Sequence, residues 1–279
     1  MNYQKTLRKN YFFLLFIAVS SLLNAQSKRF YYELNFKRDS LGKYPAKEVM
    51  VLEINKNSNV FLSNDYIVTD SLNNIHRDNP QFASPKFEKV LEYNKSDESF
   101  NVINRLSFHY YQYNTKKKID WKILNDKKKI GNFEVTKATA EYGGRSWIAW
   151  FCPEIPLPYG PYVFYGLPGL ILEVSDDQEN YHFSFIQNKN YNTELNSFEI
   201  IKKLLAHDKM DIKEKDWAKI QLNYYKNPIP EYFSGDAYIE KESGEKYTRN
   251  DYREVEKNVQ KQIKILNNPI ELSEKVEYK

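Results

Sequence analysis

Residues 143–169 constrain the fold of this chain more than any other stretch, because they concentrate the two residue types that interrupt regular structure. Five of the eleven prolines fall within residues 153–168, and five of the nine glycines fall within residues 143–169. Proline fixes φ and removes a backbone N–H donor. Residues 153–168 are therefore predicted to form a stiffened loop and not a helix.

Two apolar segments flank this loop, and both have the composition of β-strands. Residues 147–151 (WIAWF) precede it and residues 170–174 (LILEV) follow it. Pro168 and Gly169 match the central positions of a type II turn, in which glycine accepts a positive φ. Loops longer than about 12 residues are uncommon and often functional. The sequence therefore predicts two core strands joined by an unusually long connection.

Large aromatic side chains fill this loop, which is unusual for a connection exposed to water. The aromatic residues that we single out there are Tyr159, Tyr162, Phe164 and Tyr165. Such a cluster has two interpretations. The rings either cover the open edge of the core, as satellite apolar clusters under long loops do, or they line a ligand-binding groove.

The rest of the first two-thirds alternates between apolar and polar residues, which is typical of half-buried strands. Residues 30–36, 50–54 and 119–123 show the period of two most clearly, and residues 100–113 are also rich in β-forming types. We predict an α+β fold that is mainly β: a curved antiparallel sheet, open like a half-barrel. Residues 26–279 are expected to form a single domain.

The C-terminal part, residues 192–279, has helical spacing instead. In residues 248–266 apolar side chains recur every three or four positions, and Thr248 with Asp251 has the spacing of a capping box. We expect these helices to pack on the sheet, with docking on a partner as the alternative for the apolar stripe.

The first 25 residues have the pattern of a cleaved secretory signal, with three basic residues before a short apolar run. Their removal lowers the formal net charge from +4 to 4 − 3 = +1. The mature chain is therefore expected to be exported, periplasmic or secreted, without a transmembrane segment. It lacks a cysteine at the cleavage point, so a lipoprotein anchor is not expected, and near neutrality gives no global reason to bind nucleic acid.

The stretch GRSWIAWFCPEIPLPYGPYVFYGLPGLILEV resembles the signature of the GLPGLI family, which comprises secreted proteins of Bacteroidetes-type bacteria. The family is named after the hexapeptide formed here by Gly166, Leu167, Pro168, Gly169, Leu170 and Ile171. The resemblance covers residues 119–188 well, and NNPIEL near the C-terminus also fits. It implies an envelope or secreted location and no established activity.

Catalytic and metal-binding signatures are missing from the sequence. It contains no HExxH, GxSxG or GxGxxG pattern, its four histidines are scattered, and no metal or cofactor is expected. Cys152 is expected to be a buried, inert thiol, since no basic residue adjoins it. A hydrolase with Glu154 and Asp176 as an acid pair is the alternative to a protein without catalytic activity.

Arg145 is the remaining candidate, because Gly143 and Gly144 precede it and Trp147 follows it. Glycines allow close approach of a backbone, and a guanidinium can bind a carboxylate through two hydrogen bonds. Arg145 either binds a carboxylate such as a peptide end, or pairs internally with Glu154 or Glu173.

Together these features favour a non-enzymatic envelope protein. Its expected ligand is a peptide, a lipid-like molecule or another envelope protein, bound by the aromatic loop of residues 153–168.

Overall fold

The structure is a computed structural model, and it describes residues 27–279 except residues 108, 198, 201 and 203–208. The predicted signal segment, residues 1–25, lies outside the described residues, as do residues 198, 201 and 203–208 of the C-terminal part that is expected to be helical. Among the residues described, no helix is both long enough and apolar enough to cross a bilayer.

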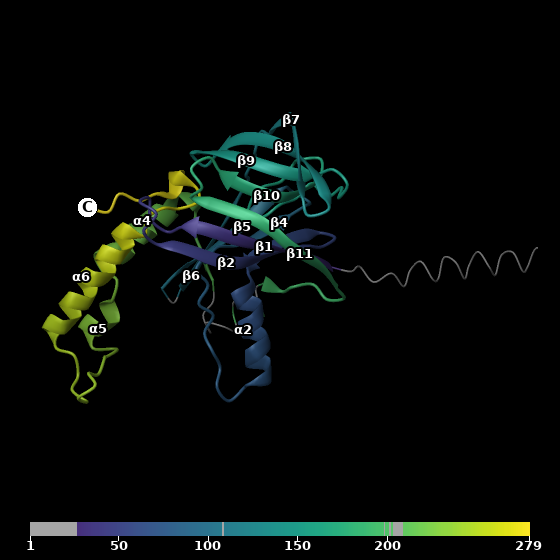
Figure 1. Cartoon of the computed structure of the whole chain (residues 1–279). Coiled ribbons are helices and arrows are strands. Elements are labelled where there is room, and N and C mark those ends of the chain that lie inside the picture. The colour runs from purple at the N-terminus through teal and green to yellow at the C-terminus, as the bar shows by residue number, and fades with distance from the viewer. Residues whose placement is uncertain (1–26, 108, 198, 201, 203–208) are drawn as a thin grey trace, which may run out of the picture.

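One sheet of twelve strands forms the body of the protein (Figure 1). The strands are β1 (Ser27–Lys37), β2 (Pro45–Ile54), β3 (Ser58–Ser63), β4 (Val90–Asn94), β5 (Ser99–Leu106), β6 (His109–Thr115), β7 (Lys122–Ile130), β8 (Phe133–Tyr142), β9 (Arg145–Cys152), β10 (Leu170–Asp176), β11 (Tyr181–Tyr191) and β12 (Met210–Asp211). Their order in the sheet is β12-β6-β5-β4-β3-β2-β1-β11-β10-β9-β8-β7. All neighbours are antiparallel except β12, which pairs with β6 in parallel. β1 lies between β2 and β11 and therefore joins the two halves of the sheet.

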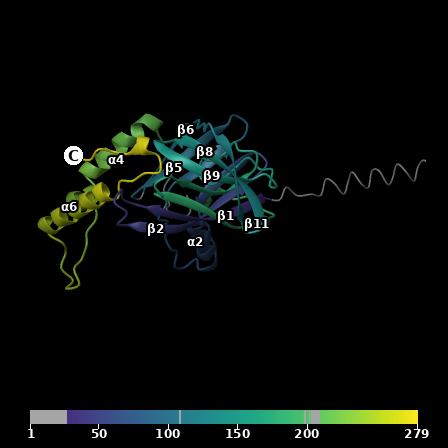
Figure 2. The ribbon, with the colours of Figure 1, turned by 45° about the horizontal axis from the view of Figure 1, so that its top comes forward.

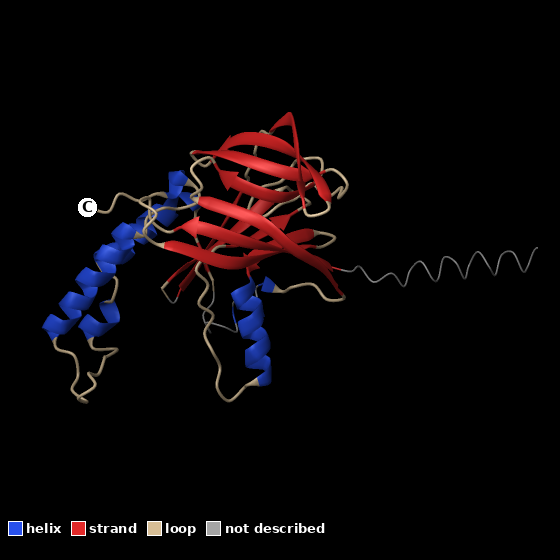
Figure 3. Cartoon of the chain, viewed as in Figure 1, coloured by secondary structure: helices blue, strands red, loops and turns tan. Residues whose placement is uncertain are grey.

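The helices lie outside the sheet (Figure 3). They are α2 (Asn64–Ile75), α4 (Trp217–Lys226), α5 (Pro230–Ser234) and α6 (Arg249–Ile265), with short 3-10 helices η1 (Glu214–Asp216) and η2 (Leu272–Glu274). Two views place α4, α6 and the C-terminus at the same end of the sheet, whereas α2 lies apart from them (Figures 1 and 2). The predicted fold class, a mainly β protein with a curved open sheet and C-terminal helices, is confirmed.

The main core lies on one face of the sheet, as the period-two pattern predicts. In β1, Tyr32 and Leu34 are fully buried, and Phe30 and Phe36 are nearly so. In β3, Phe61 faces this core while Val60 and Leu62 face a smaller cluster that includes Tyr66 of α2. The two faces of β3 therefore pack against different layers.

Residues 249–265 form α6 as the sequence predicts, and its N-terminus has the expected capping box. The Thr248 side chain accepts from the Asp251 N–H, while the Asp251 side chain accepts from the Thr248 N–H. The stripe on α6 is less buried than a core stripe, since Tyr252 is its one buried residue. Most of that apolar face is therefore only partly covered.

The type II turn predicted at Pro168 and Gly169 is wrong. Gly169 does not have a positive φ; Gly166 does, at +95°. Gly169 is required for another reason, because a Cβ there would lie 2.2 Å from the carbonyl oxygen of Cys152. The chain enters β10 at this point by passing directly over the end of β9.

The two glycines give a matched test. Gly169→Ala is expected to lower the free energy of unfolding by about 3 kcal/mol, because the backbone must move to relieve the overlap. Gly166→Ala has open space around it and is expected to cost about 1 kcal/mol through its positive φ alone. Denaturant unfolding of both variants measures this, and an equal or smaller loss for Gly169→Ala would contradict the close approach.

Candidate functional site

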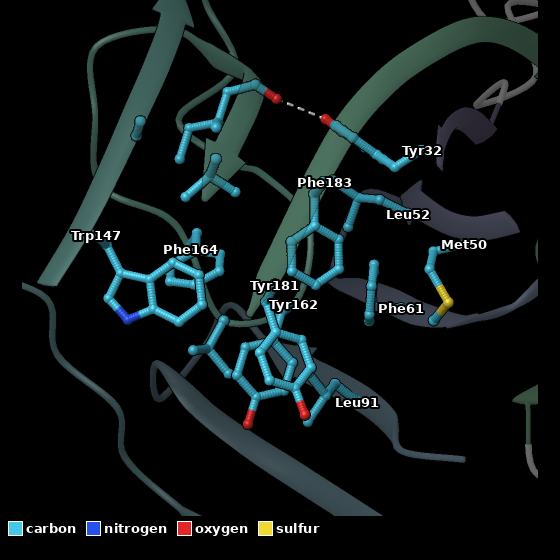
Figure 4. Packing of buried hydrophobic residues seen from close by; sticks show 14 of the residues in the cluster. Tyr32, Met50, Leu52, Phe61, Leu91, Trp147, Tyr162, Phe164, Tyr181 and Phe183 are labelled. Atoms are coloured by element: carbon cyan, nitrogen blue, oxygen red, sulfur yellow. Dashed lines mark hydrogen bonds between the residues drawn. The ribbon is translucent and has the colours of Figure 1, made fainter. Parts of the chain in front are cut away.

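The loop of residues 153–168 covers the main core and lies against the strands. It folds back on itself through an isolated bridge between Tyr159 and Tyr165, and the Ile171 N–H donates to the Tyr159 carbonyl. Tyr162 and Phe164 are buried to 4% and 0% exposure. Both rings point into the core among Phe61, Trp147 and Phe183 (Figure 4). The loop therefore has the geometry of the core cap.

The predicted ligand-binding residues divide into two groups. Arg145, Trp147, Tyr162 and Phe164 are buried, so they expose almost no surface in this conformation. Tyr159 and Tyr165 are only partly buried and pack with Tyr93. The space enclosed beside them is about 20 Å³, which is room for about one water.

Arg145 has an internal partner, but not one of the glutamates expected from the sequence. Its Nη1 lies 3.1 Å from Asp176 Oδ2, in a pair that is almost fully buried. Its other nitrogens bind the C-terminal part of the same chain: the Ile270 carbonyl at 3.0 Å, Asn268 Oδ1 at 2.7 Å and the Pro269 carbonyl at 2.8 Å. Arg145 thus binds an extended peptide segment that belongs to its own chain.

We call residues 268–274 the strap. Its Asn268 accepts a hydrogen bond at its carbonyl from the Tyr181 hydroxyl and donates from Nδ2 to the Lys37 carbonyl. The Leu272 N–H donates to the Gly143 carbonyl at 2.6 Å. A Cβ on Gly143 would lie 3.0–3.1 Å from Glu271 atoms, so the glycine allows the strap to lie close to the β8–β9 turn.

Glu271 is a buried, charged residue of the strap and contacts the body of the protein. Lys117 Nζ lies 3.0 Å from its carboxylate, and the Tyr162 hydroxyl donates to the same group. Burial pushes the pKa of Glu271 upward, but the charges of Lys117 and Lys89 and these hydrogen bonds outweigh burial and hold the pKa below its ordinary value of 4.5. The pair is therefore charged at neutral pH.

Tyr162 supplies its hydroxyl from a strained backbone position. Its φ is +57°, which is uncommon for a residue with a large side chain. Burial raises the pKa of Tyr162 well above 10, and the nearby charge of Glu271 adds to this effect. The hydroxyl remains a proton donor to Glu271, so the loop of residues 153–168 is attached to the strap.

A second carboxylate holds the end of the strap. Glu274 receives two hydrogen bonds from Lys89 Nζ, at 2.7 and 2.6 Å, and a longer one from the Tyr113 hydroxyl. Both side chains of the ion pair are about 15% exposed. The strap is therefore fixed along its length by Arg145, Lys117 and Lys89.

An open cavity of about 470 Å³ lies between the strap, the adjacent end of the sheet and the C-terminal helices; we call it the end cavity. Phe36 and Phe87 line its sheet side, in edge-to-face contact at 5.9 Å. Trp217 of α4, Ile263 of α6 and Leu266, the C-cap of α6, also line it. The C-terminal part of the apolar stripe of α6, at Val259 and Ile263, lines this space.

Two side chains with amide groups, Asn104 and Gln221, belong to the wall of the end cavity. Asn104 is 2% exposed, and its side-chain amide interacts with the Tyr113 hydroxyl. Gln221 Nε2 on α4 has no hydrogen-bond partner in the described part of the chain and is enclosed by protein atoms. Both amide nitrogens have almost no accessible surface, so neither presents a free donor to the cavity.

Other side chains considered from the sequence do not form a catalytic arrangement. Asp176 pairs across the sheet with Trp147, at the opposite end of β9 from Cys152, and Glu154 lies beyond Cys152. The strand therefore separates Glu154 from Asp176 by roughly 15 Å or more. Cys152 is a buried free thiol, and the described residues contain no group of three side chains suited to a metal ion.

The residues that build the strap and the end cavity had only weak sequence signals. Lys117 lies in a lysine run that looks solvated, yet it is 9% exposed. Asn104 lies within an ordinary strand pattern. The segment NNPIEL stood out for its family resemblance, but nothing in its spacing indicated a contact with Arg145.

The fold and this site define a class of protein: an open, curved β-sheet whose C-terminal chain returns as a buried strap beside a cavity. Residues 143–173 match a family model described as "Protein of unknown function (Porph_ging)". The match contains Gly143, Arg145 and Tyr162, which contact the strap. A search of curated proteins finds no match.

Two solved structures of PNGF-II, in space groups C2 and P21, are similar to this chain. Their TM-scores are 0.51 and 0.50 at 12% and 13% identity, and each alignment covers 70% of this chain. The chain spans about a third of the length of the PNGF-II chains, 32% and 33%. At this identity the similarity concerns the fold alone.

Removing the guanidinium tests the attachment of the strap. Arg145→Ala leaves Asp176 buried without its partner, so the free energy of unfolding is expected to fall by about 3–5 kcal/mol. Cleavage by a glutamate-specific protease after Glu271 should increase as well. Arg253→Ala, on the exposed face of α6, is the control. A strap that resists cleavage as well in Arg145→Ala as in the control would contradict the arrangement.

The Glu271 pair predicts a pH dependence. The folded-state pKa of Glu271 lies below the ordinary value of 4.5. The ionised Glu271 therefore stabilises the fold above pH 4.5, and this stabilisation is lost as the pH falls through the folded-state pKa. In denaturant unfolding between pH 7 and pH 3, the free energy of unfolding should fall less for Glu271→Gln than for the unchanged chain. Glu254→Gln, whose carboxylate is 70% exposed, should leave the profile unchanged.

Proposed function

We propose that this chain is an exported binding protein of the bacterial envelope, without catalytic activity, and that the end cavity is its binding site. The carrying observation is the open cavity of about 470 Å³, whose walls are largely apolar and also include charged side chains. Small-molecule sites are concave and mostly apolar, with a few polar groups that fix orientation, and commonly enclose about 300–1,000 Å³. The end cavity has these properties.

The loop of residues 153–168 has an indirect role in this proposal. Its buried Tyr162 holds Glu271, and the strap that carries Glu271 contributes Pro269 and Ile270 to the cavity wall. Of the predicted binding residues in the loop, Tyr159 and Tyr165 keep part of their rings exposed. In this proposal these two rings are the ones that contact a partner protein. The loop therefore affects the cavity only through its contact with the strap.

The N-terminal sequence pattern and the family resemblance support the envelope location in this proposal. The N-terminal segment has the composition of a secretory signal, and the hexapeptide of residues 166–171 resembles the GLPGLI signature. The matched family model carries no assigned activity. Within the described residues no observation favours the hydrolase alternative, since Asp176 is engaged by Arg145.

Filling the cavity tests the proposal. Native mass spectrometry of the protein purified from a bacterial periplasm should show a bound small molecule, and Ile263→Trp should lose it because the larger ring occupies the cavity. Lys261→Trp places the same ring on the exposed face of α6 and should keep the ligand. Equal occupancy in the two variants, with similar melting temperatures, would contradict the assignment of the site.

A further inference from the structure

A second open cavity, of about 680 Å³, lies over β3, β4, β5 and β6 beside residues 194–197; we call it the side hollow. Tyr93 of β4 lines it, and the ring of Tyr93 packs with Tyr159 and Tyr165 of the loop at centroid distances of 6.2 and 5.3 Å. The hollow therefore adjoins the two partly exposed rings. The inference rests on the proposed function in this respect, because it concerns the partner that these rings contact.

The charged side chains that line the side hollow are all negative. Three carboxylates and no basic side chain belong to its lining: Glu92, Asp97 and Glu194. None of the three forms an ion pair with another described residue. Glu92 accepts hydrogen bonds from Ser197 and Asn101, and Asp97 accepts from Ser99. These donors are neutral, so they leave the negative charge of the hollow in place.

The two turns next to the side hollow carry further charges. The β2–β3 turn has Lys56, and the β4–β5 turn has Lys95 and Glu98. Lys95 Nζ donates to a backbone carbonyl and lies 4.9 Å from the centre of the Tyr159 ring. The face of a tyrosine ring attracts a cation. Lys95 is therefore an ammonium group of the chain itself that is held against this surface, and four carboxylates still face two lysines.

The tyrosine rings lie close to this negative charge. The pKa of Tyr93 is raised to about 12 and that of Tyr165 lies above its ordinary value of 10, mainly because of burial, and the charge of Glu98 contributes at both hydroxyls. Lys118, the cation beside Tyr165, is paired with Asp120 at 2.8 Å. An anionic partner would therefore be repelled here, whereas a cationic one would be attracted.

We propose that this surface binds a flexible, basic segment of a partner protein. Lysine or arginine side chains of that segment enter the side hollow, and their apolar stems lie against the rings of Tyr93 and Tyr159. Asn94 and Asn196 line the same hollow as exposed side chains, and their amide nitrogens can donate to the carbonyls of a peptide backbone.

Fluorescence anisotropy with the full-length mature protein tests this inference. The probes are labelled short peptides in which lysine, glutamine or glutamate alternates with glycine. The lysine peptide should bind, and its affinity should fall as the salt concentration rises because exposed charges are screened. The other two peptides should bind at least about fivefold more weakly. Equal affinity for the lysine and glutamine peptides, or no binding of the lysine peptide at low salt, would overturn the proposal.

Removing two charges from the hollow locates the site. Asp97→Asn with Glu194→Gln keeps an oxygen for Ser99 and should weaken the lysine peptide about fivefold, with a smaller salt dependence and an unchanged melting temperature. Glu254→Gln on the exposed face of α6 is the control and should leave the affinity unchanged. The same affinity in the double variant and the control would contradict the assignment to the side hollow.

Tyr159→Leu separates this inference from the proposed function. The loss of the ring face should weaken the lysine peptide about threefold. If the carboxylate variant weakens binding and Tyr159→Leu does not, the hollow stands and the partner contact through the loop, which belongs to the proposed function, is wrong. If sedimentation shows self-association that the carboxylate variant abolishes, a second copy supplies the lysines and the partner proposed here is wrong.

Discussion

The buried guanidinium of Arg145 is the interaction on which the rest of this structure depends. It lies at the start of β9, where it joins Asp176 at the end of β10 to three groups of the strap. Asp176 also accepts from the Tyr181 N–H and from Asn180 Nδ2, so the same carboxylate organises the β10–β11 turn. A buried charge needs such a set of partners, and the chain returns from α6 to supply them.

The Pro/Gly-rich stretch makes this arrangement possible through three close approaches. Gly143 allows Glu271 to pass beside the β8–β9 turn, Gly160 lies against Ile171 and Phe164, and Gly169 passes over Cys152. Between them the loop of residues 153–168 turns its aromatic rings inward. The concentration of glycine and proline therefore reflects crowding around one junction, where the sheet, the loop and the strap meet.

The fold was largely predictable from the sequence because its elements are determined locally. Alternation in residues 30–36 and 50–54 follows from burial of one face of a strand, and the capping box at Thr248 and Asp251 is a contact over three residues. The strap was not predictable, because Arg145 and Asn268 are separated by more than a hundred residues. Spacing along the chain carries no information about such a contact.

The candidate site was predictable only in part, for a related reason. The sequence singled out Arg145 as a residue that either binds a peptide or pairs internally, and the structure combines the two: an internal pair with Asp176 and a peptide segment of the same chain. Trp147, Tyr162 and Phe164 were singled out for their size, which suits a core as well as a groove. Lys117 and Asn104 lie within a charge run and a strand pattern that hide their burial.

Hydrogen–deuterium exchange of the Leu272 amide tests the central claim most directly, because that N–H donates to the Gly143 carbonyl. If the strap is an integral part of the body, this amide exchanges only through global unfolding, as slowly as the core amides of β1. Exchange at the rate of a fraying terminus, with β1 still protected, would contradict the account.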